Sequence, residues 1–166
     1  MPIHNIEPVY DQNSKILILG SFPSVKSRQG QFFYHHPQNR FWKILEKLFD
    51  HQPLQTIEEK KTFLLKHHIA VWDVIASCDI QGSRDSSIEN VQINDIVSLL
   101  KKTSIKQIYT NGKKAHHLYQ KYCFSLTHIE DICLPSSSPA NAAYSLEKLL
   151  LSWQEIQQFL TNNDLF

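Results

Sequence analysis

Four short runs of mostly apolar residues recur along the chain, each about the length of a β-strand. The runs cover residues 16–19, 69–72, 105–109 and 129–134. Their apolar positions are largely continuous rather than alternating, which is typical of strands that are covered on both faces. The pattern therefore predicts a sheet that is buried from both sides.

Helical spacing of apolar residues fills the stretches between and after these runs. This spacing predicts helices over residues 41–49, 96–100, 112–122 and 146–160. Thr56 and Glu59 have the spacing of a capping box, which predicts one more helix that runs to about Lys66. Strands therefore alternate with helices along most of the chain.

This alternation favours an α/β fold with a parallel sheet. We expect a three-layer α/β/α sandwich with a central four-stranded parallel sheet. The 166 residues are enough to bury a sizeable core, and a single domain over residues 1–166 is expected. Residues 78–90 form the most loop-like segment because they are rich in Gly, Ser and Asp, and residues 162–164 are expected to be a frayed end.

Composition limits the class of protein. The net charge of +1 neither favours nor excludes a nucleic-acid partner. No run of about 18 apolar residues occurs, so no membrane span is expected. Residues 1–5 lack the basic and apolar pattern of a secretory signal, and we expect a cytoplasmic monomer.

Cysteine and histidine usage points to neither a disulfide framework nor a metal site. Cys78, Cys123 and Cys133 are odd in number and include no C-x-x-C spacing. The histidines at 35–36, 67–68 and 116–117 are adjacent pairs, and adjacent residues do not share a helix face. We therefore expect reduced thiols, no metal and no cofactor.

Polar residues follow each of the four expected strands. They occupy residues 20–24 after the first, Asp73 after the second, residues 111–112 after the third and residues 135–141 after the fourth. Ligands of open α/β sheets bind beyond the carboxyl ends of the strands. Four such segments at one edge predict a binding pocket.

Basic residues gather near the same segments. Lys26 and Arg28 flank the first loop, Arg40 follows Asn39, and residues 113–114 are both lysine. A transient DNA contact is compatible with this distribution. Scattered solvated charges are the alternative interpretation.

Taken together, three segments resemble the uracil-DNA glycosylase superfamily. The sequence G-S-F-P-S at residues 20–24 resembles its first motif, and H-P-Q-N-R-F-W at residues 36–42 is very similar to the mismatch-specific uracil/thymine branch. The sequence L-P-S-S-S-P-A-N at residues 134–141 resembles its second motif. The combination is most similar to the hypoxanthine (deoxyinosine) DNA glycosylase branch, and it covers the chain from the first strand to the start of the last helix.

The resemblance implies a monofunctional DNA glycosylase of base excision repair. Such an enzyme extrudes a deaminated base, here hypoxanthine, and hydrolyses its N-glycosidic bond to leave an abasic site. Its partner is DNA that contains the deaminated base. A mismatch-specific uracil/thymine glycosylase and a non-catalytic lesion-binding module are the alternatives.

The resemblance also implies a catalytic residue. Phe22 occupies the position where uracil-directed branches place a catalytic Asn or Asp, and a phenyl ring cannot orient water. The family assigns that function to the residue that is Asn39 here, whose amide oxygen can accept a hydrogen bond from the attacking water. By local pattern alone, Asn39 is a cap of the helix that starts at Arg40. The two roles are compatible.

Four residues are expected to contact the base by the same resemblance. They are Phe22, Tyr34, His36 and Asp73. Tyr34 aligns with the aromatic residue that stacks on the extruded base, and an ionised Asp73 would accept from N1–H of hypoxanthine. An ordinary core role for Tyr34 and a capping role for Asp73 are the alternatives.

The remaining expected site residues would contact DNA. They are Ser24, Lys26, Arg28, Ser136, Ser137, Ser138, Pro139, Ala140 and Asn141. Serine hydroxyl and backbone N–H groups can donate to phosphate oxygens, although a plain serine-rich turn has the same sequence. Ala140 is a small residue near the position of the bulky wedge of related branches, and Leu134 stands where uracil-specific branches have a histidine.

Overall fold

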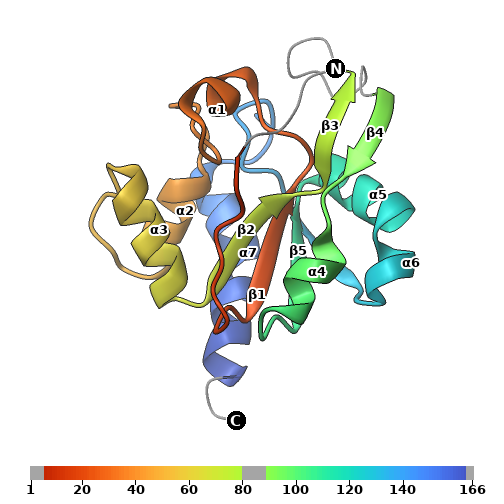
Figure 1. Ribbon diagram of the computed structural model, residues 1–166. Coiled ribbons are helices and arrows are strands. Elements are labelled where there is room, and N and C mark those ends of the chain that lie inside the picture. The colour runs from red at the N-terminus through yellow and green to blue at the C-terminus, as the bar shows by residue number, and fades with distance from the viewer. Residues whose placement is uncertain (1–5, 80–88, 164–166) are drawn as a thin grey trace.

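A four-stranded parallel sheet forms the centre of the computed structural model, which describes residues 6–79 and 89–163 (Figure 1). The strand order is β2-β1-β5-β6. The strands are β1 (Ile16–Gly20), β2 (Ile69–Asp73), β5 (Gln107–Asn111) and β6 (Asp131–Leu134). All three pairings are parallel, so the four carboxyl ends lie at one edge. The expected parallel sheet is confirmed, although β5 begins and ends two residues later than the sequence predicts.

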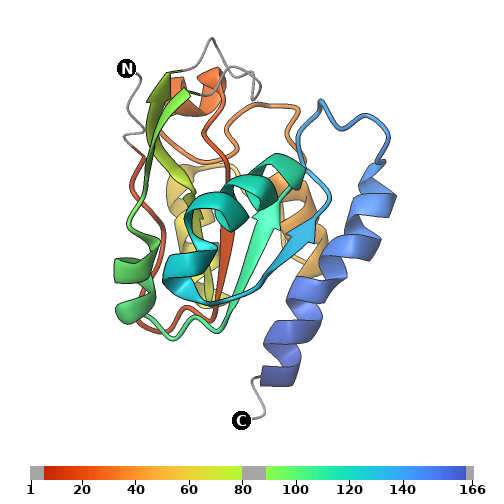
Figure 2. The ribbon, with the colours of Figure 1, turned by 90° about the vertical axis from the view of Figure 1, so that its right-hand side faces the viewer.

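Helices cover both faces of this sheet. Side chains of β1 alternate between the two faces: Ile16 and Ile18 belong to one buried cluster, and Leu17 and Leu19 to the other. The first cluster packs against α2 (Phe41–Leu48), α3 (Ile57–Lys66) and α7 (Leu146–Asn163). The second packs against α4 (Ile96–Lys101), α5 (Lys113–Tyr122) and α6 (Phe124–Thr127). Figure 2 shows α5 and α7 on opposite sides of the sheet, which confirms the three-layer arrangement.

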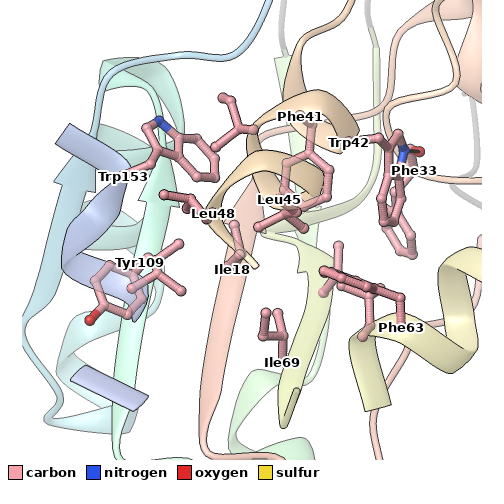
Figure 3. Packing of buried hydrophobic residues seen from close by; sticks show 14 of the residues in the cluster. Ile18, Phe33, Phe41, Trp42, Leu45, Leu48, Phe63, Ile69, Tyr109 and Trp153 are labelled. Atoms are coloured by element: carbon pink, nitrogen blue, oxygen red, sulfur yellow. Dashed lines mark hydrogen bonds between the residues drawn. The ribbon is translucent and has the colours of Figure 1, made fainter. Parts of the chain in front are cut away.

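Aromatic contacts fix α2 against α7. The Phe41 ring meets the Trp42 ring edge-on at 4.8 Å and the Trp153 ring at 5.8 Å (Figure 3). Each such pair stabilises by about 0.5–1.5 kcal/mol beyond its buried area. The Trp153 indole N–H also donates to the Pro135 carbonyl at 2.9 Å. Helix α7 therefore holds the segment that follows β6.

The helix-start signals are accurate where they involve local hydrogen bonds. The Thr56 hydroxyl oxygen accepts from the Glu59 N–H at 3.0 Å, and the Glu59 carboxylate accepts from the Gln55 N–H at 3.0 Å. The helix expected from Gly112 starts one residue later, because Gly112 has φ 99° and is the N-cap of α5. A Cβ on Gly112 would also lie 3.0 Å from Cβ of Ser136.

Two features were not expected. A short helix α1 (Val25–Gly30) follows β1, with the Ser24 hydroxyl oxygen accepting from the Ser27 N–H at 3.1 Å. An antiparallel pair, β3 (Ile75–Asp79) and β4 (Glu89–Ile93), forms a second sheet. The prediction of a loop over residues 78–90 was therefore wrong at both ends, and residues 80–88 lie outside the described residues.

The reasons for these misses are local. α1 has too few apolar residues to show helical periodicity, and the register between β3 and β4 shifts twice, so their pairing is irregular. The expected frayed end was also wrong for residues 162 and 163, which are still helical, and residue 164 lies outside the described residues.

Candidate active site

The carboxyl edge of the sheet holds a pocket of about 280 Å³. Residues that follow all four strands of the parallel sheet contribute to its lining, as the sequence predicts. The lining residues are Gly20, Ser21, Phe22, Pro23, Ser24, Ser27, Phe33, Tyr34, Asn39, Asp73, Asn111, Gly112, Lys113, Lys114, Ser136, Ser137 and Ser138. The connections that carry them gather around α1 at the top of Figure 1.

Three polar side chains from separate segments form one hydrogen-bonded chain in this pocket. The Asn111 amide N–H donates to the Ser137 hydroxyl oxygen at 2.9 Å, and the Ser137 backbone N–H donates to the Asn111 amide oxygen at 2.9 Å. The Ser137 hydroxyl in turn donates to Oδ1 of Asn39 at 2.8 Å. Ser137 is fully buried, so its hydroxyl acts within the site rather than on the surface.

The amide of Asn39 is therefore fixed from two sides. Oδ1 also accepts from the Phe41 backbone N–H at 3.0 Å, so the Asn39 side chain satisfies the first N–H of α2, although the N-cap residue itself is Arg40. These two bonds use both acceptor positions of an amide oxygen. In this arrangement Nδ2 of Asn39 makes no hydrogen bond to any described residue, and the catalytic role of Asn39 stays a prediction.

Arg40 fastens the segment between β6 and α7, residues 135–145, which we call the serine loop. Its Nη2 donates to the carbonyls of Ser138 at 2.8 Å and Asn141 at 3.0 Å, and Nη1 donates to the Tyr144 carbonyl. The Arg40 backbone N–H donates to the Ser137 carbonyl at 3.0 Å. The guanidinium is thus satisfied inside the protein, which sets it apart from a cation that faces DNA.

Tyr34 lies flat on Phe41, with ring centroids 4.0 Å apart and planes tilted by 21°. Its backbone is left-handed, with φ 53°, which is uncommon for an aromatic residue. The ring reaches towards the end of β1, where a Cβ on Gly20 would lie 3.1 Å from the Tyr34 hydroxyl oxygen. Burial, followed by the nearby Asp73 carboxylate, raises the pKa of this hydroxyl, and the Asn111 amide offsets part of the rise.

Asp73 meets the same glycine from the neighbouring strand. It pairs with Gly20 in the register of β1 and β2, and its side chain is 4% exposed. A Cβ on Gly20 would overlap the Asp73 carboxylate, so glycine is required there. The Asp73 backbone carbonyl accepts from the Asn94 amide N–H at 2.8 Å. Gly20 therefore leaves room for both the Tyr34 hydroxyl and the Asp73 carboxylate at the end of β1.

The first loop supplies one wall of the pocket. Phe22 lines the pocket. Arg28, on α1, holds its guanidinium carbon 5.3 Å from the centre of the Phe22 ring. Ser24 both lines the pocket and caps α1. Lys26 is exposed on the same helix. Of these four residues, Phe22 and Ser24 reach the pocket, whereas Lys26 and Arg28 flank it.

His36 lies beside the pocket and is not part of its lining. Its Nδ1 accepts from the Gln38 N–H at 3.0 Å, and its carbonyl accepts from the Asn39 N–H at 3.0 Å. The contact of His36 with the base stays a prediction. The hydrogen bonds of His36 shape the turn that presents Asn39.

The serine loop divides into a lining and a tip. Ser136, Ser137 and Ser138 line the pocket. Pro139 and Ala140 are exposed beyond it, and the Asn141 amide N–H donates back to the Ser136 carbonyl at 3.0 Å. The tip is therefore the part of the loop that could meet a partner surface.

For several residues of the site, the sequence did not predict the role that the structure gives them. The sequence places Asn111 after a strand without a role, and it leaves Arg40 open between a DNA contact and a solvated charge. Lys113 and Lys114 were noted as basic residues, and both line the pocket in the first turn of α5. Their positions after the third strand were the available signal, since that is where ligands meet an α/β sheet.

Two kinds of feature are absent from the described part of the chain. No group of three or more His, Cys, Asp or Glu residues there is arranged to hold a metal ion. None of the described helices has the length and apolar character needed to cross a membrane.

Known proteins resemble this chain over most of its length. A sequence model of the Uracil DNA glycosylase superfamily matches residues 7–160. A protein of Methanosarcina acetivorans named "Hypoxanthine DNA glycosylase" is 37% identical over 139 residues, which are 82% of this chain and 87% of that protein. A protein of the same name from Methanosarcina barkeri is 34% identical over 152 residues, covering 89% and 93% of the two chains.

A solved structure has the same fold. The solution NMR structure of a candidate uracil DNA glycosylase from Methanosarcina acetivorans superimposes with a TM-score of 0.76 and 32% sequence identity. The match covers 92% of this chain and 96% of that one.

Proposed function

Because this chain belongs to the uracil DNA glycosylase superfamily, we propose that it is a DNA glycosylase that removes hypoxanthine from DNA. It hydrolyses the N-glycosidic bond of the deaminated nucleotide and leaves an abasic site. The bond breaks through an oxocarbenium-like sugar, as in other glycoside hydrolyses. The two curated relatives that carry this name support the choice of base.

One observation carries the proposal: a single pocket brings together Asn39, Tyr34 and Asp73 from three separate segments. Phe22 lines the same pocket, and base–aromatic stacking on its ring would contribute about 1–3 kcal/mol. The Tyr34 ring lies against Phe41, and the edge of the ring that carries the hydroxyl meets the base. Asp73, at the end of β2, accepts a hydrogen bond from the base.

Asn39 holds the water that attacks the sugar. In the free protein Oδ1 already has two donors, the Phe41 N–H and the Ser137 hydroxyl. The Phe41 N–H is fixed by the helix, whereas a hydroxyl hydrogen can rotate. Rotation of the Ser137 hydroxyl therefore frees one position on Oδ1 for water, while the Phe41 bond keeps the amide plane in place.

DNA binds over the rim of this pocket. Lys113 and Lys114 lie in the first turn of α5, where the helix N-terminus adds partial positive charge. They attract the phosphates next to the extruded nucleotide. The exposed tip of the serine loop, Pro139 and Ala140, follows β6 and approaches a groove of the DNA. Lys26 extends the basic surface along α1.

The base preference is tested on a panel of duplexes. Each duplex carries hypoxanthine, uracil, xanthine or thymine opposite guanine, and free-base release is followed for the native protein and for Asn39→Ala. We expect release of hypoxanthine that is lost in Asn39→Ala. Release of uracil without hypoxanthine would overturn the choice of base, and lesion binding without release of any base would overturn the assignment as an enzyme.

A further inference from the structure

The hydroxyl of Tyr34 is buried without a hydrogen-bond partner among the described residues. Other buried tyrosine hydroxyls of this protein are satisfied. Tyr109 donates to the Glu155 carboxylate at 2.6 Å, and Tyr119 donates to the Ile129 carbonyl. A buried polar group normally has a partner, so an exception calls for an explanation. Tyr34 lines the pocket, so a bound ligand could supply the missing partner.

The surrounding structure holds this hydroxyl in position. The ring of Tyr34 stacks on Phe41, which is itself fully buried. The backbone of Tyr34 is left-handed, and backbone strain of this kind persists only where neighbouring structure imposes it. A strained backbone and an unpaired hydroxyl therefore coincide at one pocket residue.

An acceptor lies beside this donor. The Tyr34 hydroxyl and the Asp73 carboxylate both approach the site where Gly20 lacks a side chain. A carboxylate has about four lone-pair positions, so it can accept from a ligand in addition to its protein neighbours. The end of β1 thus presents a hydroxyl donor next to a carboxylate acceptor.

We propose that this pair reads the lactam edge of the base, with the Tyr34 hydroxyl donating to O6 of hypoxanthine and Asp73 accepting from N1–H. Deamination of adenine creates this edge, because it replaces an amino donor at position 6 with an oxygen acceptor and an N1 acceptor with an N1–H donor. Adenine would place a donor against Tyr34 and an acceptor against Asp73. Guanine has the lactam edge too, but a correctly paired base costs more to extrude than a mismatched one.

The protonation of Tyr34 suits a donor. Burial, with the Asp73 carboxylate second, raises the pKa of the hydroxyl above its ordinary value near 10. The group therefore stays protonated throughout the neutral and alkaline working range. The cost of leaving it unpaired in the free protein is recovered when O6 arrives.

This assignment rests on the proposed function and names a specificity residue of the same pocket. The test compares Tyr34→Phe with the native protein on two duplexes that differ only at position 6 of the damaged base. One carries hypoxanthine, and the other carries 6-thiohypoxanthine, whose sulfur is a weak acceptor. Single-turnover excision rates and DNA dissociation constants are measured for all four combinations.

We expect Tyr34→Phe to lower excision of hypoxanthine by about tenfold or more. Excision of 6-thiohypoxanthine should change by less than about threefold, because little hydrogen bonding is lost there. An equal fall on both bases, or no fall on hypoxanthine, would overturn the role of the hydroxyl. If the native protein releases neither base, the proposed function fails and this assignment fails with it.

Tyr109→Phe is the matched control. It removes a hydroxyl that is paired with Glu155 and does not line the pocket. It should lower the melting temperature and leave the ratio of the two excision rates unchanged. Tyr34→Phe should change the melting temperature less than Tyr109→Phe does, because the Tyr34 hydroxyl makes no hydrogen bond of normal geometry to a described residue, whereas Tyr109 loses a bond of 2.6 Å. A large fall in melting temperature for Tyr34→Phe would show a partner inside the protein and contradict the assignment.

Discussion

The Ser137 hydroxyl donates a hydrogen bond of 2.8 Å to Oδ1 of Asn39, across 98 positions of sequence. This bond joins the turn that enters α2 to the serine loop that leaves β6. Ser137 also bonds Asn111 at the end of β5. The geometry of Asn39 therefore depends on two other strand ends, and its contribution can be tested separately from theirs.

Replacement of Asn39 separates its two roles. Asn39→Ala should lower the excision rate by about 10²–10⁴-fold, because the water loses its holder. It should also lower the free energy of unfolding by about 1 kcal/mol, because the Phe41 N–H loses its cap. Excision assays under single-turnover conditions and denaturant titrations measure the two effects.

Asn39→Asp is the companion variant. It keeps an oxygen towards Phe41 and Ser137 and adds a second acceptor in place of Nδ2. If water is held by an acceptor, Asn39→Asp should retain far more activity than Asn39→Ala. Equal loss in both variants would mean that Asn39 does not accept from the attacking water.

Ser137→Ala tests the link to Asn39. Oδ1 of Asn39 would keep its Phe41 bond, but the Asn111 amide N–H would lose the hydroxyl to which it donates. The serine loop would then be less firmly held against the end of β5, and the excision rate should fall about tenfold. DNA affinity should change by less than about twofold, because the buried hydroxyl does not reach the surface. Ser104→Ala, which loses a single exposed bond to the Gln12 carbonyl, is the control and should affect neither quantity. Loss of affinity without loss of rate would instead indicate a phosphate contact by Ser137.

Arg40 and Lys113 should differ in how salt affects their variants. Arg40→Met should lower the free energy of unfolding by about 2–3 kcal/mol, because several carbonyls of the serine loop lose a charged donor. The slope of log Kd against log salt should stay unchanged, because the guanidinium contacts protein rather than phosphate. Lys113→Ala should reduce that slope by about 0.9 with little loss of stability. A reduced slope in Arg40→Met would place Arg40 on DNA.

Alkaline pH should destabilise the fold through buried tyrosines. Burial raises the pKa of Tyr119 to about 12 and, together with Glu155, raises the pKa of Tyr109 further. Unfolded tyrosines ionise near pH 10, so above that pH the unfolded chain releases protons that the folded chain keeps. The free energy of unfolding should therefore be independent of these groups below about pH 9 and should fall as pH rises beyond about pH 10.

Denaturant titrations at about pH 9, 10 and 11 measure this dependence. Tyr109→Phe should make the decline shallower by up to about 1.4 kcal/mol per pH unit. An unchanged slope in Tyr109→Phe would contradict a raised pKa for this hydroxyl.

The parallel sheet and most of its helices could be predicted from sequence because burial is periodic. The continuous apolar run that became β1 and the helical spacing after Asn39 each reflect contacts with whole faces of neighbouring elements. The cap at Thr56 was predictable because it involves residues three positions apart. By contrast, α1 and the β3–β4 pair have no strong local period.

The location of the pocket could be predicted from the sequence, but the hydrogen bonds among its residues could not. The parallel arrangement brings every strand end to one edge, so polar residues after the strands had to meet there. The sequence could not assign Arg40 to the carbonyls of the serine loop or exclude His36 from the lining. Such contacts depend on the path of each loop, which side chains distant in sequence decide together.

The sequence by itself determined the alternation of buried elements, the glycines that permit close approach, and the polar residues at each strand end, because these are set by neighbours within a few positions. Only the tertiary structure decided that Asn39 is held by Ser137 and that the Tyr34 hydroxyl stands unpaired beside Asp73. Hydrogen bonds are satisfied within about 3 Å in space. Separation along the chain places no limit on which groups come that close.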